Sequence, residues 1–409
     1  MSDTTLRIGL IGCGQIADAH LQQIRRVKGA EVIAVCDHEP LLARQAAERF
    51  EIPMRFSNSA TMVQDARPDV VHITTPVHSH APLAIGLLDA GVHVYVEKPL
   101  SIDAAEAREV MASARENERL VCIGHDQLFD PAWLRATEIV ESGELGEVRH
   151  VESVLGYPIN GPFGRLVVST PDHWVRRLPG GLFQNTISHP LYRITEFLDD
   201  DSPRIEASWF NGHDSIPFPT ELRANLYGHR VSGTLLFTSR VQPFQRLTRI
   251  YGSKGGLEVD LDTQLVRHFR SSGYPGALGR LDAPLRQLRE AGSNLKRNIG
   301  RFLHGDLHYF EGMKRLCDEF YAAVRSGAKE APVTAAEAIR VTAIMDTIFE
   351  SCLQGKESPF NERRHRAVLD ESQQPLGCCD PSGFVALLLV SKRWRVLSNG
   401  GSFQTDPAC

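Results

Sequence analysis

LRIGLIGCGQIADAH, residues 6–20, joins a short apolar run to a glycine-rich turn and the start of a helix. The apolar run has the length and the β-branched content of a buried strand. Gly12, Gly14 and Ala17 then follow in GxGxxA spacing. Gly12 permits the turn, Gly14 lets the backbone approach a pyrophosphate, and Ala17 lets the helix pack closely against the strand. The stretch therefore predicts a dinucleotide-binding turn at a helix N-terminus.

A carboxylate ends the next strand-like run. Residues 32–36 lead to Asp37, twenty residues after Ala17, which is the position where an acidic side chain binds the ribose hydroxyls of NAD. A carboxylate there repels the 2′-phosphate of NADP, and His38 is not an arginine that would neutralise one, so NAD is favoured over NADP. Asp37 is also placed to cap the helix expected from EPLLARQAAERF, and the two roles are compatible.

Strand-like and helix-like runs alternate as far as about residue 125. The further strands are expected at residues 68–74, 92–96 and 120–124, and the helices between them at 80–90 and 104–117. Repeated strand–helix units predict a parallel sheet with helices on both faces, and ligands bind at the carboxyl edge of such a sheet. We therefore expect residues 1–125 to form an NAD-binding, Rossmann-type domain.

Lys98 stands at that edge, in VHVYVEKPLS, directly after an expected strand. A lysine fixed at the end of a buried parallel strand faces the ligand crevice, whereas most lysines lie on the surface. The loop TTPVHSH after the preceding strand is expected beside the nicotinamide, although a single histidine at a helix start, here His80, is more often a cap or packing residue than a catalyst. The residues expected to contact the cofactor are Gly12, Gly14, Gln15, Ile16, Ala17, Asp37, Thr75, Pro76, His80, Glu97 and Lys98.

The second half of the chain changes to short runs of alternating polarity, such as VRHVESV, ELRANLYG and RVSGTLLFTS. These runs predict a second, α+β domain over residues 126–360 with a large, mainly antiparallel sheet that has one uncovered face. A homo-oligomer, dimer or tetramer, would bury that face. Two helices, expected from HYFEGMKRLCDEFYAAVRSG and TAAEAIRVTAIMDTIFESCLQG, close the domain.

Asn185 and His189 stand out within this domain, in the stretch PGGLFQNTISH. They are four residues apart, so on a helix they share a face and reach the same point. The preceding Gly180 and Gly181 permit a close approach of the backbone to a ligand. A buried structural histidine is the alternative interpretation of His189.

Three stretches together, GLIGCGQIADAH, TTPVHSHAPLAIGLLDAGVHVYVEKPL and PGGLFQNTISH, resemble the glucose-fructose oxidoreductase, inositol dehydrogenase and MocA family (Gfo/Idh/MocA) over residues 5–360. The resemblance implies an NAD-dependent dehydrogenase of carbohydrate metabolism that acts on a CH–OH group of a sugar, cyclitol or nucleotide sugar. The lysine of the family's EKP motif, a catalytic acid/base, falls on Lys98. The family's later aspartate and histidine fall on Asn185 and His189, so the aspartate is missing. In HDQLFDPAW, Leu128 stands where an arginine is common.

Oxidation of a secondary alcohol needs a hydride acceptor and a base for the hydroxyl proton. We assign Lys98 and His189 to proton transfer. Asn185 cannot accept a net proton, so we assign it to positioning a substrate hydroxyl or Lys98. Two alternatives are an oxidoreductase that keeps its NAD bound and recycles it between two substrates, and a non-catalytic NAD-binding scaffold or sensor. We expect no metal, because His78 and His80 have no third ligand at a recognisable spacing.

The composition of the chain limits the number of domains and the class of protein. A chain of 409 residues with 42% hydrophobic and 23% charged residues can bury a full core in about two domains, and its net charge of -5 argues against general nucleic-acid binding. The N-terminus is no signal peptide and no apolar run is long enough to span a membrane, so a cytoplasmic protein is expected. The eight cysteines lack CxxC spacing, which favours reduced, mostly buried thiols.

A basic insertion is expected at about residues 273–304. Apolar residues recur there at alternating spacings of three and four, and residues 267–301 hold eight Lys/Arg against two acids. The pattern predicts an amphipathic helix, divided in two at Pro284 and Gly292, whose basic face is solvated or meets an anionic membrane surface or a phosphate-bearing substrate. Residues 361–409 match no pattern, and the apolar run at 384–390 is too short to span a bilayer.

Overall fold

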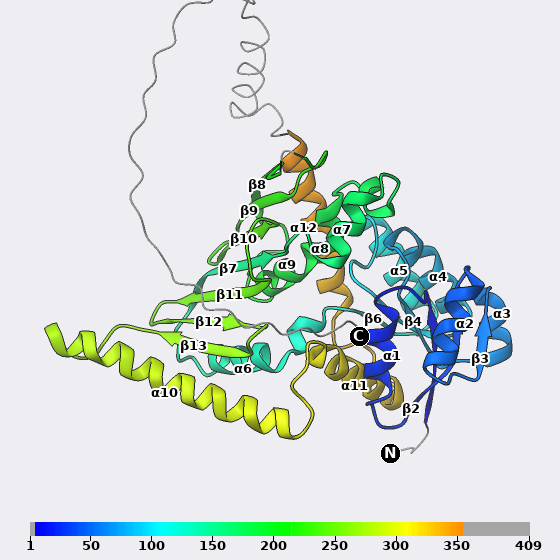
Figure 1. Ribbon diagram of the computed structural model, residues 1–409, viewed down its shortest axis with the longest axis horizontal. Helices are drawn as coiled ribbons and strands as arrows, with labels where there is room; N and C mark the ends of the chain where they lie inside the picture. The colour runs from blue at the N-terminus through cyan, green and yellow to red at the C-terminus, as the bar shows by residue number, and fades with distance from the viewer. Residues whose placement is uncertain (1–4, 214, 355–409) are drawn as a thin grey trace, which may run out of the picture. The chain divides into compact units, whose positions relative to one another are not determined.

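The computed structural model describes residues 5–213 and 215–354 (Figure 1). Its first sheet has six parallel strands in the order β3-β2-β1-β4-β5-β6. The strands are β1 (Leu6–Ile11), β2 (Ala30–Cys36), β3 (Met54–Phe56), β4 (Val70–Ile73), β5 (His93–Val96) and β6 (Val121–Ile123). The strand order reverses at β1, and the crevice at the carboxyl ends of β1 and β4 is where dinucleotides bind in such sheets. The predicted Rossmann-type sheet is thus confirmed.

Five helices cover the two faces of this sheet (Figure 1). They are α1 (Ala17–Ile24), α2 (Pro40–Arg49), α3 (Ser59–Ala66), α4 (His80–Asp89) and α5 (Ala104–Glu116). The unit formed by β3 and α3 was not predicted, because β3 has three residues and none of them is buried. The strands at the centre of the sheet are buried on both sides, which agrees with their continuous apolar runs.

The second sheet has seven strands in the order β13-β12-β11-β7-β10-β9-β8. All pairs are antiparallel except β7 with β10, so the prediction of a large, mainly antiparallel sheet is confirmed. The strands are β7 (Val148–Gly156), β8 (Arg204–Phe210), β9 (Glu221–Tyr227), β10 (Ser232–Thr238), β11 (Gln245–Gly252), β12 (Gly256–Asp260) and β13 (Leu265–Phe269). One face packs against α6 (Pro131–Glu141), α9 (Ser188–Thr195) and α12 (Ala335–Gln354).

The opposite face of this sheet carries polar partners. Arg249 Nε donates to Glu258 Oε2 at 2.8 Å, and the hydroxyl of Tyr251 donates to Glu152 Oε2 at 2.9 Å. These four side chains therefore have hydrogen-bond partners within one chain. Homo-oligomerisation through the face stays a prediction.

The chain returns to the first sheet after completing the second. Helix α11 (Glu311–Ser326) packs against α1, and α12 packs against both α5 and β8. Leu316 and Phe320 of α11 share a buried cluster with Ile8 and Tyr95 of the first sheet. The described residues accordingly lie in one compact unit, while the domain bounds at 125 and 360 stay predictions.

Helix α10 (Gly276–Leu303) is continuous through Pro284 and Gly292, so the expected division into two helices is wrong (Figure 1). A proline removes one backbone hydrogen bond, which does not break a helix that is held along its length by other contacts. Side chains of α10 supply such contacts to β13 and to the turn before it.

Five of the cysteines, Cys13, Cys36, Cys122, Cys317 and Cys352, are free and buried, as predicted for them. Cys378, Cys379, Cys409 and the segment 361–409 lie outside the described residues. Within residues 5–213 and 215–354, we find no helix that is long and apolar enough to cross a membrane. The cytoplasmic location stays a prediction.

Candidate active site

The glycine turn between β1 and α1 presents open backbone. Gly12 has φ +97, and a Cβ added to it would lie 2.7 Å from the main-chain nitrogen of Thr75, so a side chain is excluded there. A Cβ added to Gly14 would meet nothing within 4 Å. Ile16, the N-cap of α1, makes no side-chain cap hydrogen bond. Ala17 N donates to Gly14 O at 3.2 Å, and no side chain of the N-cap covers the N–H groups that follow, so these are available to an anion, as a dinucleotide pyrophosphate requires.

Asp37 lies against this turn. Its Oδ2 accepts from Cys13 N at 2.7 Å and its Oδ1 accepts from Glu39 N at 2.9 Å. An ionised carboxylate has about four acceptor positions, so it can still accept from ribose hydroxyls. The cap of α2 is Glu39, whose side chain accepts from Leu41 N, because the helix begins one residue later than expected. The alternative role of Asp37 as that cap is wrong.

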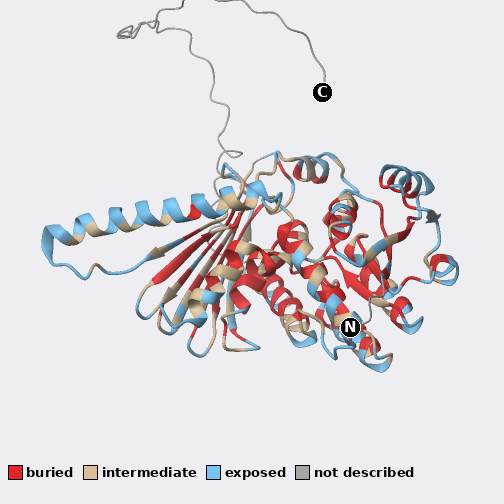
Figure 2. Ribbon diagram, turned by 90° about the horizontal axis from the view of Figure 1, so that it is seen from below, coloured by how far each residue is buried: buried red, intermediate tan, exposed pale blue. Residues whose placement is uncertain are grey.

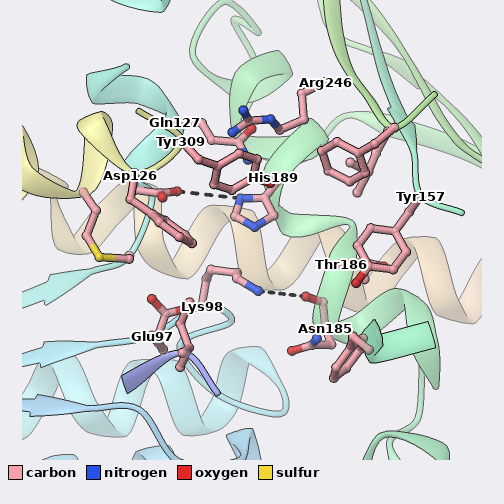
Figure 3. A pocket seen from close by; sticks show the side chains of 17 residues that line it. Glu97, Lys98, Asp126, Gln127, Tyr157, Asn185, Thr186, His189, Arg246 and Tyr309 are labelled. Carbon is pink, nitrogen blue, oxygen red and sulfur yellow. Dashed lines mark hydrogen bonds and ion pairs between the residues drawn. The ribbon is translucent and has the colours of Figure 1, made fainter. Parts of the chain in front are cut away.

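A cavity of about 230 Å³ opens at the carboxyl ends of β5 and β6, between the two sheets (Figure 3). The first sheet contributes Ile16, Glu97 and Lys98 to its lining, and the second half contributes Asn185 and His189. The structure thus brings together the three residues predicted to carry the chemistry, beside two of those predicted to contact the cofactor. Ile16, two residues after Gly14, is the residue of this region that lines the cavity.

Lys98 reaches across the cavity to the second half of the chain. Its Nζ donates to the main-chain oxygen of Asn185 at 3.1 Å (Figure 3). This contact is made by the backbone, so any residue at position 185 supplies it, and a positioning role for the Asn185 side chain stays a prediction. The side-chain amide of Asn185 stays available for a substrate hydroxyl.

Asn185 and His189 do not share one helix. Asn185 belongs to α8 (Leu182–Thr186) and His189 to α9, and the two helices meet at Ile187. Both still line the cavity. The expectation for Gly180 is wrong: a Cβ added there would lie 2.4 Å from the ring of Phe349, so its close approach is to α12 and not to a ligand.

The hydroxyl of Tyr192 contacts both His189 and Asp126. The Tyr192 hydroxyl lies 2.7 Å from His189 Nδ1, accepts from Gln127 N at 3.3 Å and donates to Asp126 Oδ1 at 3.4 Å. A hydroxyl has only one proton to donate, so a Tyr192 that donates to Asp126 accepts from His189 Nδ1. In that tautomer His189 Nε2 keeps its lone pair and can act as a base.

The electrostatics agree with that role. Burial, and next the charge of Lys98, hold the pKa of His189 well below its usual value, so the ring is neutral near neutral pH. Burial and the neighbouring Glu97 raise the pKa of Asp126 to about 6, so its carboxyl is mostly ionised at neutral pH. Sequence reasoning missed both Asp126 and Tyr192. The signal for Asp126 was present, because it follows β6 at the same sheet edge as Lys98 follows β5.

Glu97 ends a buried chain of hydrogen bonds. Its Oε2 accepts from Lys98 N at 3.2 Å, and its Oε1 lies 2.8 Å from His20 Nε2. His20 Nδ1 lies 2.9 Å from His72 Nδ1, and His72 Nε2 lies 2.8 Å from the hydroxyl of Tyr321. Burial would raise the pKa of Glu97, but the hydrogen bond and charge of His20 bring it below its usual value. Through this chain, α1, β4 and α11 hold the loop that carries Lys98.

His125 packs beside the hydrogen-bonded group of His189, Tyr192 and Asp126, which we call the relay. It is buried, and its Nδ1 has no hydrogen-bond partner among the described residues. Its ring lies 4.4 Å from that of Tyr192, and burial lowers its pKa from 6.5 to about 3. The unfolded chain therefore binds the proton first as the pH falls, and stability is lost below about pH 6.5. When the pH is lowered from about 7 to about 5, the free energy of unfolding should decrease in both proteins. We expect this decrease to be about 2 kcal/mol smaller in His125→Phe than in the wild type.

Urea denaturation at the two pH values measures this difference. The exposed His38→Phe serves as the control and should lose as much stability as the wild type. An equal loss in all three proteins would show that His125 is not a source of the acid sensitivity.

Thr75, Pro76 and His80 lie outside the lining of the cavity. Nδ1 of His80 lies 2.9 Å from the carbonyl oxygen of Pro99, and its Nε2 lies 2.7 Å from that of Thr75. The ring is almost fully buried and ties the two loops together, which agrees with the packing role that is more common for such a histidine. Cofactor contacts by these three residues stay predictions.

Arg246 and Tyr309 form the end of the cavity remote from Lys98, and sequence reasoning missed them too (Figure 3). Arg246 Nε donates to Asp262 Oδ1 at 2.8 Å, and its guanidinium lies 4.0 Å over the ring of Tyr309. The cavity thus contains a second cation. Among residues 5–213 and 215–354, there is no group of three or more His, Cys, Asp or Glu side chains that could hold a metal ion.

Comparisons with known proteins identify the two halves. The family described as "Oxidoreductase family, NAD-binding Rossmann fold" matches residues 6–125, and the "GFO/IDH/MocA C-terminal domain" matches residues 133–258. The chain belongs to the Gfo/Idh/MocA oxidoreductase family. The first match covers the glycine turn, Asp37 and Lys98, and the second covers Asn185 and His189, so the resemblance seen in these stretches is confirmed.

Among curated Gfo/Idh/MocA relatives, the inositol 2-dehydrogenase of Salmonella typhimurium is 33% identical over 146 residues, which are 35% of this chain and 44% of that protein. Inositol 2-dehydrogenase 2 of Saccharopolyspora erythraea is 33% identical over 174 residues, which are 41% of this chain and 51% of that protein. The chain spans about half the length of the curated relatives it matches.

Solved Gfo/Idh/MocA structures match more of the chain. The WlbA dehydrogenase from Bordetella pertussis, in complex with NADH and UDP-GlcNAcA, has a TM-score of 0.70 at 18% identity and covers 87% of this chain and 97% of its own. The myo-inositol 2-dehydrogenase from Lactobacillus plantarum has a TM-score of 0.67 at 18% identity, with 86% and 98% covered. At these identities the likeness shows a shared fold.

Proposed function

We propose that the protein is an NAD-dependent dehydrogenase that transfers a hydride between nicotinamide and a CH–OH carbon of a sugar, cyclitol or nucleotide sugar. One observation supports this most strongly. His189, whose pKa is held well below its usual value by burial, and the amine of Lys98 line one cavity at the carboxyl edge of a dinucleotide-binding sheet. This is the pair of groups that alcohol oxidation requires next to a hydride acceptor.

The glycine turn and Asp37 fit NAD. The open backbone at Gly14 and the uncapped start of α1 would hold the pyrophosphate, and Asp37 would accept from the ribose hydroxyls. A carboxylate at this place also disfavours the 2′-phosphate of NADP. NAD, when bound, supplies the carbon that accepts the hydride.

Residues of the chain accept and donate the proton. His189 Nε2 accepts the proton of the substrate hydroxyl. His189 Nδ1 can then donate its proton to the Tyr192 hydroxyl, which donates its own to Asp126. Lys98 Nζ shares in the transfer and stabilises negative charge on the substrate oxygen. Asn185 positions a hydroxyl through its side chain. In the reductive direction His189 and Lys98 return the proton.

The cavity contains a carboxylate even though the family's aspartate is missing. Position 185 holds an amide, but Asp126 brings a carboxylate to His189 from a different segment. This observation weakens the case for a non-catalytic scaffold or sensor, because a catalytic relay is complete without an acid at position 185. An NAD that remains bound and is recycled between two substrates stays an alternative.

The substrate class rests on the relatives and on the cavity. Relatives are named inositol 2-dehydrogenases, and one structural neighbour was solved with UDP-GlcNAcA. Polar groups at both ends of the cavity, from Lys98 to Arg246, suit a polyhydroxylated substrate. Arg246 additionally favours a substrate that carries a negative group at the end remote from the reacting carbon.

A turnover screen tests the proposal. Purified protein is incubated with NAD and with panels of cyclitols, sugars and nucleotide sugars, and reduced nicotinamide is followed by its absorbance. We expect NAD reduction with at least one panel and much weaker reduction with NADP. NAD binding without turnover on any panel would contradict the proposal and favour the scaffold. Cofactor that copurifies at about one equivalent would favour the recycling enzyme.

A further inference from the structure

Helix α10 is exposed along most of its length (Figure 2), and its exposed residues include large apolar ones. Its large apolar side chains are between 51% exposed, at Ile299, and 75% exposed, at Leu303. The stripe comprises Leu278, Leu281, Leu285, Leu288, Leu295, Ile299, Phe302 and Leu303. Contiguous exposed apolar surface of this length marks an interaction site.

The opposite, polar side of α10 faces β13, the edge strand of the second sheet. Asn294 is buried and its side chain donates to Val266 O at 3.0 Å, while Glu290 Oε2 accepts from His268 N at 3.1 Å. These side chains satisfy the backbone groups that an edge strand leaves unpaired. The polar contacts determine how the helix is rotated, and they leave the stripe facing outward.

The stripe has a strict heptad spacing. Seven of its residues, with Gly292, fall at alternating intervals of three and four from 278 to 302, the a and d positions of a two-stranded coiled coil. A helix with such a seam buries it against a second helix of the same kind. Seven large side chains at roughly 100 Å² each amount to about 700 Å² per copy, close to the roughly 800 Å² per partner of a stable interface.

The charges of α10 argue against a membrane as the occupant. Arg286 pairs with Asp282 at 2.8 Å, Arg297 donates to Asn294 at 2.9 Å, and Arg301 donates to Gln264 at 2.6 Å. These cations are engaged within the protein. A helix lying on an anionic surface needs cations along both flanks of its apolar face. The stripe of α10, which forms the seam of the proposed coiled coil, has Arg289 and Lys296 on one flank. Its other flank holds Pro284, Ala291 and Asn298.

We propose that α10 pairs antiparallel with α10 of a second copy of this chain. Gly292 decides the direction. In a parallel pair it would face itself and leave a gap, whereas in an antiparallel pair Leu288 of the other copy packs over it. The antiparallel pair also places Asp282 of each copy near Lys296 of the other. Arg289 meets its own counterpart, which is the one unfavourable contact.

Native mass measurement over a range of concentrations tests the proposal. The double variant Leu285→Glu/Leu295→Glu, made in the full chain, should have half the mass of the wild type at equal concentration, whatever other interface the protein uses. The control Ala283→Glu/Gln287→Glu adds the same charge to the same helix away from the seam and should keep the wild-type mass. All four positions lack buried side chains, so the fold should tolerate these changes, and melting curves check this.

Two results would overturn the proposal. One is a wild-type mass that the seam variant does not change. The other is an unchanged mass together with cosedimentation of the wild type, but not of the seam variant, with vesicles of anionic lipid, which would make the occupant a membrane. Orientation has its own test: under mild oxidation Leu285→Cys/Leu295→Cys should cross-link two chains and Leu285→Cys alone should not. Cross-linking by Leu285→Cys alone would mean a parallel pair.

Discussion

Replacing Lys98 by methionine is expected to lower kcat/KM by about 10²- to 10⁴-fold, the usual contribution of a general acid/base. Methionine keeps the length of the side chain but removes the amine that reaches Asn185 O across the cavity. The variant should still bind NAD with an affinity within about threefold of the wild type. Initial rates of NAD reduction, together with titration of NAD binding, measure the two effects separately.

The matched control for this variant is Lys254→Met, which removes an exposed lysine from the turn between β11 and β12. It should leave both kcat/KM and NAD affinity unchanged. A Lys98→Met enzyme that retains turnover within about threefold of the wild type would remove Lys98 from the mechanism.

Disruption of the relay behind His189 should give the second largest loss. We expect Asp126→Asn and Tyr192→Phe each to lower kcat by about 10- to 100-fold with little change in KM, because they hold the tautomer of His189 and do not bind the substrate in the ground state. His189→Gln should cost at least as much. The double variant His189→Gln/Tyr192→Phe should be no worse than His189→Gln alone, because residues that act as a unit are not additive.

Tyr227→Phe is the matched control for the tyrosine, since Tyr227 lies on the uncovered face of the second sheet. It should leave kcat unchanged. Additive losses in the His189 and Tyr192 pair would show that the two residues act independently, and the relay would then have no place in the mechanism.

Local patterns in the sequence were sufficient for the fold and for part of the site. Gly12, Gly14 and Asp37 have fixed spacings along one strand–turn–helix unit, and Lys98, Asn185 and His189 lie in short motifs. Each of these residues could be found from its neighbours in the chain. The structure brings Lys98, Asn185 and His189 to one cavity, while the cofactor contacts of Gly12, Gly14 and Asp37 stay predictions.

The rest of the site depends on contacts between distant segments. Asp126, Tyr192 and Arg246 come from different elements, and only packing brings them into one cavity. Tyr192 follows His189 by three residues on α9, but its contact with Asp126 joins distant segments of the chain. The continuity of α10 through Pro284 has the same origin, because contacts along β13 hold the helix.

We infer that His189 accepts the substrate proton while an ionised Asp126 lies behind it. The most direct test is the pH dependence of kcat/KM for NAD reduction in the wild type and in Asp126→Asn, because this profile reports the groups of the free enzyme. Since the pKa of Asp126 is raised to about 6 and its ionised form is the active one, wild-type activity should fall as the pH drops below about 6. Asp126→Asn should lack this fall and be slower throughout. The same acid limb in both proteins, at equal rates near neutral pH, would contradict the claim.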